Sequence, residues 1–372
     1  MRLLIEKSAL LKALQHVTSV VERRNTIPIL ANVSLRAEEN SLHLKATDLD
    51  IEVTETAKAE TMTHGGTTVP AHTLHDIVRK LPDGAQIELA NKADEGRLAI
   101  SAGSSRFLLA CLSADDFPEL GLDDMSHAFQ LPARDLARLI DKTKFAISTD
   151  ETRYYLNGIY FHAIETEDGT FLRSVATDGH RLARMDVALP DGAMGMPNII
   201  LPRKTVQELA KLLTDKADEV SVNLSANKIR FTAGDVVLTS KLIDGTFPDY
   251  QRVIPQGNDK SMRIDTAAFI SAVDRVSTLS SEKGRAVKLN MAEGKLVLSV
   301  NNPESGSATE ELELDYHGEA LEIGFNARYL LDIAAQFESD RAVFEMSDPS
   351  APTVLHDEND TSALYVLMPM RV

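Results

Sequence analysis

Hydrophobic residues along the chain follow two periods, one typical of strands and one typical of helices. Residues 1–6 predict a short strand, and a helix with one apolar face follows from about Ser8. Alternating apolar and polar residues at 42–45 and 49–54 predict half-buried strands. A second helical pattern then stops at Pro82. More strands complete this first pattern, at 86–90, 97–102 and 106–112.

The same succession of elements recurs about every 125 residues, so the chain contains an internal repeat in three copies. The first two copies are marked by three pairs of similar segments: Val69-Pro70 with Leu201-Pro202, Asp116 to Leu120 with Thr246 to Tyr250, and Thr47-Asp48 with Thr177-Asp178. The third copy is fainter, and Ile323 to Asn326 precedes one of its helices. The helices of the later copies are predicted at about 132–146, 202–213, 266–279 and 326–337.

Each copy predicts two helices packed on antiparallel sheets, which is an α+β arrangement. Joints rich in Gly, Asp or Asn divide the chain into three domains, at residues 1–121, 127–252 and 260–372. Three like domains in one chain suggest a curved array. A symmetric contact with a second chain closes such an array into a ring.

Composition is that of a globular protein. A length of 372 residues suggests two or three domains, and 43% hydrophobic residues suffice to fill their cores. The single cysteine, Cys111, cannot form an intramolecular disulfide and fits a reducing compartment. The pair Glu6-Lys7 interrupts the first segment too early for a signal peptide, and no apolar run reaches the roughly 18 residues of a membrane span. We therefore expect a cytoplasmic protein.

The net charge of −17 argues against binding nucleic acid by general electrostatic attraction. Basic residues nevertheless gather on the predicted helices, at Lys12, His16, Arg23, Arg79, Lys80, Arg134, Arg138, Lys142, Arg203, Lys204 and Lys211. One such helix indicates little, because any solvated helix face carries some Lys and Arg. Several together, with acids gathered in strands and loops, predict a basic lining along which phosphate backbones pass. No base-reading motif is present, so any such contact is expected to ignore base sequence.

The segment Thr177 to Leu182 combines an acid, a glycine, an imidazole and a guanidinium, and it has two interpretations. Asp178 and His180 could serve a hydrolase as an acid/base pair, or Asp-Gly could simply make a polar turn. The chain has no nucleotide-binding, metalloprotease or serine-hydrolase motif and no metal-like Cys/His cluster, so no cofactor or metal is expected. The other two copies lack a counterpart of His180. Catalysis is therefore the minor alternative.

The C-terminal segment Tyr365 to Val372 is apolar almost throughout. Residues 365–367 predict a last core strand. Met368-Pro369-Met370 fits a core strand less well than residues 365–367 do. Methionine side chains form adaptable surfaces for varied apolar partners, so this tail indicates a partner-binding surface.

Four motifs together resemble the beta subunit of bacterial DNA polymerase III, the sliding clamp family: Arg153 to Gly158, Thr177 to Leu182, Phe247 to Val253 and Tyr365 to Arg371. The resemblance covers the whole chain. It implies a head-to-tail homodimeric ring of six like domains whose helices line a hole around duplex DNA. It also implies that the chain has no catalytic activity and tethers the replicative polymerase to DNA. A closed ring cannot leave DNA sideways, which reconciles the net charge of −17 with a DNA partner.

The resemblance further implies which residues meet each partner. Polymerases, the clamp loader and repair proteins would bind one pocket through a short segment with a glutamine and an apolar-aromatic end. The implied pocket residues are Leu156, Thr177, Gly179, His180, Arg181, Leu182, Pro248, Arg252, Val253, Asn326, Tyr329, Val366, Met368, Pro369, Met370 and Arg371. The implied DNA-facing residues are Arg24, Tyr154, Tyr155, Arg203 and Lys204. The implied dimer contact joins Arg106, Phe107 and Leu109 to Thr278, Leu279 and the acidic stretch from Glu304 to Glu310.

Two departures from the family pattern lie beside the implied pocket. Gly284 stands where relatives can have an aromatic residue, and the loop 348–352 also differs. Both leave the rim of the pocket and its ranking of partners open. The main alternative function is a peptide-binding scaffold that does not encircle DNA.

Overall fold

The computed structural model describes residues 1–92, 96–121, 125–213, 218–281 and 285–371. They form two compact units. Unit 1 consists of Met1–Ala137, Pro190–Pro197 and Lys204–Leu242, and unit 2 of the described residues of Arg138–Leu189, Asn198–Arg203 and Ile243–Val372. The three predicted domains follow the sequence repeat, whereas the two units follow contacts in space, so the two divisions differ.

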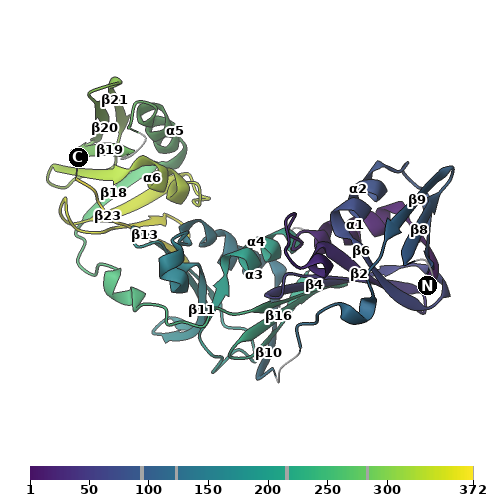
Figure 1. Ribbon diagram of the computed structural model, residues 1–372. Coiled ribbons are helices and arrows are strands. Elements are labelled where there is room, and N and C mark those ends of the chain that lie inside the picture. Colours follow the sequence, from purple (N-terminus) through teal and green to yellow (C-terminus); the bar gives the residue numbers. More distant parts are fainter. Residues whose placement is uncertain (93–95, 122–124, 214–217, 282–284, 372) are drawn as a thin grey trace. The chain divides into compact units, whose positions relative to one another are not determined.

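Unit 1 contains two antiparallel sheets with helices packed on them. The five-stranded sheet has the order β5 (Glu60–Thr63), β1 (Arg2–Glu6), β7 (Gln86–Lys92), β8 (Arg97–Ala102), β9 (Ser105–Ala110). The eight-stranded sheet has the order β10 (His127–Pro132), β15 (Glu219–Leu224), β16 (Lys228–Ala233), β17 (Val236–Lys241), β4 (Ile51–Lys58), β3 (Ser41–Thr47), β2 (Asn32–Glu38), β6 (Gly65–Pro70). Helices α1 (Lys7–Thr18) and α2 (Ala71–Lys80) lie side by side, and α1 also contacts β3 and β4 (Figure 1).

Unit 2 repeats this plan. Its eight-stranded sheet has the order β14 (Ile199–Pro202), β11 (Gly158–Thr166), β12 (Gly169–Thr177), β13 (Arg181–Ala188), β25 (Ala363–Leu367), β24 (Thr353–Asp357), β23 (Arg341–Met346), β18 (Lys260–Asp265). Its four-stranded sheet has the order β21 (Gly306–Glu313), β20 (Lys295–Asn302), β19 (Ala286–Ala292), β22 (Leu321–Asn326). Helices α5 (Thr266–Ser277) and α6 (Ala327–Ala334) lie side by side (Figure 1).

Two more helices, α3 (Ala133–Asp141) and α4 (Arg203–Leu212), belong to the middle copy of the repeat. Short 3-10 helices connect other elements, at Pro28–Ala31, Ala114–Asp116, Lys144–Ala146, Glu151–Leu156 and Tyr250–Val253. Among the described residues, no helix is both long enough and apolar enough to cross a membrane.

The junctions between strand and helix confirm the repeat. Pro70, Pro132 and Pro202 each end a strand, and a helix begins at the next residue. Proline suits this place because its fixed φ and missing N–H do not disturb the helix that follows. In the third copy Asn326 takes the position, and its side chain accepts hydrogen bonds from the backbone nitrogens of the first turn of α6, at 3.0 and 3.4 Å.

Neighbouring copies of the repeat share sheets. In unit 1, β17 of the second copy pairs with β4 of the first, so that Leu238 lies opposite Val53. In unit 2, β13 of the second copy pairs with β25 of the third, so that Leu182 lies opposite Val366. Each pairing satisfies backbone groups that would otherwise stand at an open sheet edge. The sequence repeat does not predict this sharing.

The prediction of a strand at 49–54 is wrong at its first residues. The strand β4 begins at Ile51, because Leu49 has a positive φ of 79° and lies in a turn. Residues at that φ leave the extended conformation that a strand requires. The other strands predicted in the first copy lie within two residues of the expected bounds at each end, whereas β2, β5 and β6 were not predicted.

The helix predicted at 132–146 is also shorter than expected. The α-helical part ends at Asp141, and a 3-10 turn follows at Lys144–Ala146. Thr143 leaves helical geometry, with φ −123°, and its hydroxyl donates to the carbonyl of Leu139 at 2.7 Å. Lys142 therefore lies beyond the helix whose basic face it was predicted to extend.

Candidate functional site

The segment Thr177 to Leu182 forms a turn whose polar groups are used by its own backbone. The Thr177 hydroxyl donates to the carbonyl of Arg181 at 2.7 Å and accepts from Gly179 N at 3.1 Å. Asp178 Oδ1 accepts from the backbone nitrogens of His180 and Arg181, at 2.9 and 3.1 Å. Gly179 has φ +90°, which favours glycine. The turn is therefore built by its sequence, as the non-catalytic interpretation predicts.

The same turn recurs in the first copy. The Thr47 hydroxyl donates to the carbonyl of Ile51 at 2.8 Å and accepts from Leu49 N at 3.0 Å. Asp48 Oδ1 accepts from Asp50 N and Ile51 N, at 2.9 and 2.7 Å. The same hydrogen bonds therefore occur at equivalent positions in both turns, which confirms that Thr47-Asp48 and Thr177-Asp178 are equivalent.

His180 is not oriented as a general base by Asp178. The carboxylate accepts from the backbone N–H of His180, and the His180 ring instead lies against the Tyr329 ring, with centroids 6.3 Å apart and planes 24° apart. A catalytic Asp–His pair requires the carboxylate on the imidazole. The geometry does not support the hydrolase alternative.

Arg181 forms a fixed wall beside the turn. Its guanidinium pairs with Asp178 at 3.1 Å and Asp332 at 2.6 Å, and it donates to the carbonyl of Phe145 at 2.7 Å. It also lies over the Tyr329 ring, 4.3 Å from the centroid. Only 9% of the side chain is exposed. A planar guanidinium held from several sides has little freedom left, so the wall is rigid.

An apolar hollow of about 170 Å³ opens beside Arg181. Its lining residues are Leu156, Thr177, Gly179, Arg181, Leu182, Pro248, Asp249, Tyr250, Val253, Val366 and Met368. Leu156, Leu182 and Val366 are buried at its base, whereas Val253 and Met368 are 46% and 40% exposed. A mostly apolar hollow with a few placed polar groups suits the side chains of a short peptide.

Tyr250 lines this hollow although it was not among the predicted pocket residues. It is buried, and its hydroxyl contacts Arg173 Nη1 at 3.2 Å and His162 Nε2 at 3.0 Å. Arg173 in turn donates to both oxygens of Asp186, at 2.6 and 2.7 Å. Burial lowers the pKa of His162. The predicted motif Phe247 to Val253 contains Tyr250, but only packing shows that its ring reaches the hollow.

The C-terminal tail lies beside the turn. Met368 N donates to the carbonyl of His180 at 2.9 Å, and Met370 N donates to the carbonyl of Gly324 at 2.8 Å. A second hollow, of about 540 Å³, borders the tail and is lined by Glu322, Ile323, Gly324, Pro349, Ser350, Pro369, Met370 and Arg371. The divergent loop 348–352 therefore contributes Pro349 and Ser350 to the surroundings of the tail. Gly284, the other departure from the family pattern, lies outside the described residues.

Some predicted pocket residues do not line the apolar hollow. Arg252 is exposed and pairs with Asp249 at 2.8 Å, and Asn326 caps α6. His180 and Tyr329 stack on each other next to Arg181.

Apart from Lys142, the residues predicted to face DNA fall into two groups by their exposure. Exposed side chains belong to Arg24, Arg79, Lys80, Arg134, Tyr154, Arg203 and Lys211. Partly exposed side chains belong to Arg138, Tyr155 and Lys204. Arg138 pairs with Asp360 at 2.5 Å, and Lys204 pairs with Asp48 at 2.5 Å.

The prediction that Lys142 lies on a solvated basic face is wrong. Lys142 is buried; its ammonium donates to the carbonyl of Gln336 at 2.5 Å and pairs with Glu338 at 2.6 Å. It follows the end of α3, where the chain turns into the interior of unit 2. Its charge serves the fold of that unit.

The predicted dimer residues lie at or near edge strands. β9 is an edge of the five-stranded sheet and holds Arg106, Phe107 and Leu109; β21 is an edge of the four-stranded sheet. Phe107 is 37% exposed. Thr278 and Glu304 are exposed and Leu279 is half-buried. Glu310 in the acidic stretch pairs with Arg275 of the same chain, with Arg275 Nε 3.0 Å from the carboxylate.

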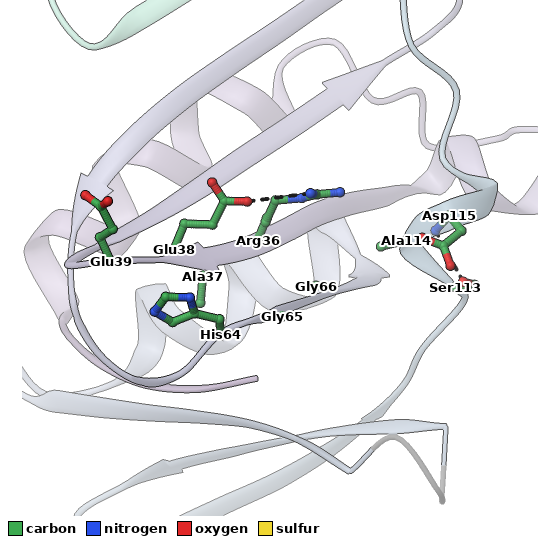
Figure 2. A pocket seen from close by; sticks show the side chains of 10 residues that line it. All are labelled: Arg36, Ala37, Glu38, Glu39, His64, Gly65, Gly66, Ser113, Ala114 and Asp115. Atoms are coloured by element: carbon green, nitrogen blue, oxygen red, sulfur yellow. Dashed lines mark hydrogen bonds and ion pairs between the residues drawn. The ribbon is translucent and has the colours of Figure 1, made fainter.

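A third hollow, of about 530 Å³, lies in unit 1, and Figure 2 shows its lining. Arg36 and Glu38 pair along β2 at 3.5 Å, and Ser113 Oγ accepts from Asp115 N at 3.2 Å. The other lining residues are Ala37, Glu39, His64, Gly65, Gly66 and Ala114. The hollow is wide and mostly polar or backbone-lined. It offers no apolar anchor, so we place the candidate site in unit 2.

The fold and the site define a class of protein: a repeated α+β clamp with an apolar peptide-sized hollow, in which the Asp-Gly turn is structural. Family models of the DNA polymerase III beta subunit match residues 1–121 (N-terminal domain), 130–249 (central domain) and 251–371 (C-terminal domain). The chain therefore belongs to the DNA polymerase III beta subunit family, the beta sliding clamps. Members of this family are non-catalytic processivity factors of DNA polymerase III.

Several relatives match along their whole length. The beta sliding clamp of Caulobacter vibrioides is 52% identical over 372 residues, and that of Pseudomonas aeruginosa is 42% identical over 373 residues, with 100% of both chains covered in each case. The crystal structure of the Bartonella birtlesii sliding clamp bound to griselimycin is 55% identical and superposes with a TM-score of 0.97, covering 100% of each chain. The sliding clamp of Caulobacter crescentus is 52% identical with a TM-score of 0.95, again over 100% of each chain.

Proposed function

We propose that two copies of this chain close head to tail into a ring around duplex DNA, and that the apolar hollow of unit 2 holds short segments of its partners. Those partners are the replicative polymerase, the clamp loader, other polymerases and repair proteins. The observation that carries the proposal is the apolar hollow with one rigid wall, at Arg181. We also propose that the protein acts in the cytoplasm, where a bacterial replication clamp meets the chromosome.

The hollow matches the chemistry of the partner segment. Its base of Leu156, Leu182 and Val366 accepts an apolar or aromatic side chain. Met368 and Val253 stand at the exposed rim, and a flexible methionine adapts to different partners. The glutamine of the segment would meet polar groups near the tail, which we assign to His180, Arg252, Asn326, Tyr329 and Arg371. Pro369 and Met370 are assigned to the same rim as apolar contacts.

Contact with DNA is proposed to rest on exposed cations rather than on base recognition. The assigned residues are Arg24, Arg79, Lys80, Arg134, Arg138, Tyr154, Tyr155, Arg203, Lys204 and Lys211. Lys142 does not belong to this set, because it is buried and paired with Glu338. A net charge of −17 keeps the overall attraction to DNA weak, so encirclement must provide the retention.

The ring is proposed to form between the edge strands β9 and β21. Unpaired strand edges present free N–H and C=O groups that a second chain can satisfy. Phe107 and Leu109 on β9 would pack against Thr278 and Leu279 after α5, and Arg106 would face Glu304 and its acidic neighbours. Because the two surfaces differ, the contact is head to tail, and two copies close it.

Retention on circular DNA tests the proposal. The full-length protein is assembled with a clamp loader on nicked circular DNA and then separated from free protein by gel filtration. We expect a dimeric mass in light scattering, and retention that is lost when the circle is linearised. Peptide binding without retention would show a scaffold that does not encircle DNA, and a monomer that never stays on circles would exclude the ring.

A further inference from the structure

Lys204, near the start of α4, is held by two carboxylates. Its ammonium donates to Asp48 Oδ2 at 2.5 Å and to Glu22 Oε1 at 3.1 Å. The Lys204 side chain is 35% exposed, Asp48 is 11% exposed and Glu22 is 60% exposed. Burial by itself lowers the pKa of Lys204, but the hydrogen bonds to Asp48 and Glu22 outweigh it and raise the pKa. The ammonium therefore stays charged at neutral pH.

Asp48 is held in place by the repeated turn. Its Oδ1 accepts from two backbone nitrogens of that turn, which leaves Oδ2 for Lys204. In the second copy Asp178 divides its oxygens in the same way, and its Oδ2 accepts from Arg181 Nε at 3.1 Å. Each copy thus uses one oxygen for the turn and the other for a cation. The cation is Arg181 at the apolar hollow in one copy and Lys204 in the other.

We propose that Glu22 and Asp48 compete with DNA phosphates for Lys204 and so keep this contact weak. The inference rests on the proposed contact between DNA and Lys204. Two carboxylates face one ammonium, so the group as a whole does not attract a phosphate. Loss of one surface charge pair at this range is expected to change the affinity for DNA severalfold without abolishing it.

The arrangement suits a protein that must move along DNA. When a phosphate leaves, the Lys204 ammonium pairs with its carboxylates again. It therefore keeps a charged partner while the protein moves from one phosphate to the next. Asp48 is fixed by the turn, whereas Glu22 is largely exposed and free of such backbone bonds among the described contacts. Glu22 is therefore the partner that a phosphate displaces most easily, and it is the residue to change.

Fluorescence anisotropy of the full-length dimer with a short labelled linear duplex at low salt tests this competition. We expect Glu22→Gln to bind the duplex roughly two- to fivefold more tightly. The matched control is Glu38→Gln, which removes the same charge from another exposed ion pair of unit 1, 3.5 Å from Arg36. It is expected to change binding less. Asp48→Asn, which keeps Oδ1 as an acceptor for the turn, should act in the same direction as Glu22→Gln.

Two further variants decide whether Glu22 acts through Lys204. Lys204→Ala should weaken binding, and adding Glu22→Gln to it should change binding no more than Glu38→Gln does. Equal effects of Glu22→Gln and Glu38→Gln in the natural chain, or a full Glu22→Gln effect in the Lys204→Ala background, would overturn the inference. If Lys204→Ala weakens binding and Glu22→Gln does nothing, only the competition is wrong. If Lys204→Ala changes nothing, the DNA contact of Lys204 is wrong as well.

Discussion

Leu49 and Gly179 occupy the same place in the two copies of the Thr-Asp turn, and both have positive backbone φ, +79° and +90°. Glycine adopts this conformation freely, whereas a residue with a Cβ loses roughly 1–2 kcal/mol there. The first copy therefore carries a backbone strain that the second copy avoids.

Leu49→Gly is expected to lower the free energy of unfolding by about 1 kcal/mol less than Leu112→Gly does, since relief of backbone strain offsets part of the lost side-chain burial. Leu49 is 39% exposed, so the two variants lose a comparable amount of burial. Urea denaturation measures the change. Leu112→Gly is the control, because Leu112 is 42% exposed but has no positive φ, and it should lower stability. Equal behaviour of the two variants would show that the strain is absent.

Gly179 should not tolerate the reverse change. A Cβ there would stand 2.7 Å from Arg153 Nη1 in addition to adopting an unfavourable φ. Gly179→Ala is expected to lower stability by roughly 1–2 kcal/mol in the same denaturation experiment.

Arg181→Lys is expected to weaken binding of a partner peptide at least tenfold. A lysine cannot reach Asp178, Asp332 and the carbonyl of Phe145 together, so the wall of the hollow would loosen. Isothermal titration with a glutamine-containing peptide ending in apolar and aromatic residues measures the affinity. Arg263→Lys is the control, because Arg263 is a 45% exposed arginine of unit 2 outside the proposed pocket, and it should leave the peptide affinity and the melting temperature unchanged. An Arg181→Lys variant with full peptide affinity would contradict the assignment of this wall.

The stability of the protein should fall as the pH is lowered from about 6.5, through His162 among other groups. Burial holds the pKa of His162 below its ordinary value of 6.5, so the unfolded chain takes up the proton first and is favoured as the pH falls. The stability that neutral His162 contributes is complete above pH 6.5. Below that pH it is lost, at no more than about 1.4 kcal/mol per pH unit. His162→Gln should flatten this slope in urea denaturation at several pH values. An unchanged slope would show that His162 does not stay neutral in the fold.

Phe107→Asp should convert the dimer to a monomer in light scattering at micromolar concentration. A carboxylate in the apolar part of the proposed contact would lose its solvation without gaining a partner. Met62→Asp is the matched control, because Met62 is 45% exposed on β5, the other edge strand of the same sheet. It should leave the dimer intact. Equal dissociation by both variants would show that Phe107 does not make the contact.

Much of the candidate site could be predicted because its parts are local. The Thr-Asp turn closes within five residues, and the strand–Pro–helix junctions lie at adjacent positions, so residue type and spacing suffice to describe them. The resemblance of four motifs to the sliding clamps then indicated which segments belong together, and the apolar hollow contains Leu156, Leu182 and Val366 from three of them. Tyr250 was missed as a lining residue, because its position depends on Arg173 and His162, far away in the chain.

By itself, the sequence determined the internal repeat, the alternation of helices and strands, the repeated turn and the family. These depend on periodicity and on hydrogen bonds between near neighbours. Only the tertiary structure decided that neighbouring copies share sheets, that Lys142 is buried, and that Asp48 holds Lys204, 156 residues later in the chain. The physical reason is that a charged side chain has the same local pattern whether it meets water or a carboxylate, and only long-range packing brings that carboxylate to it.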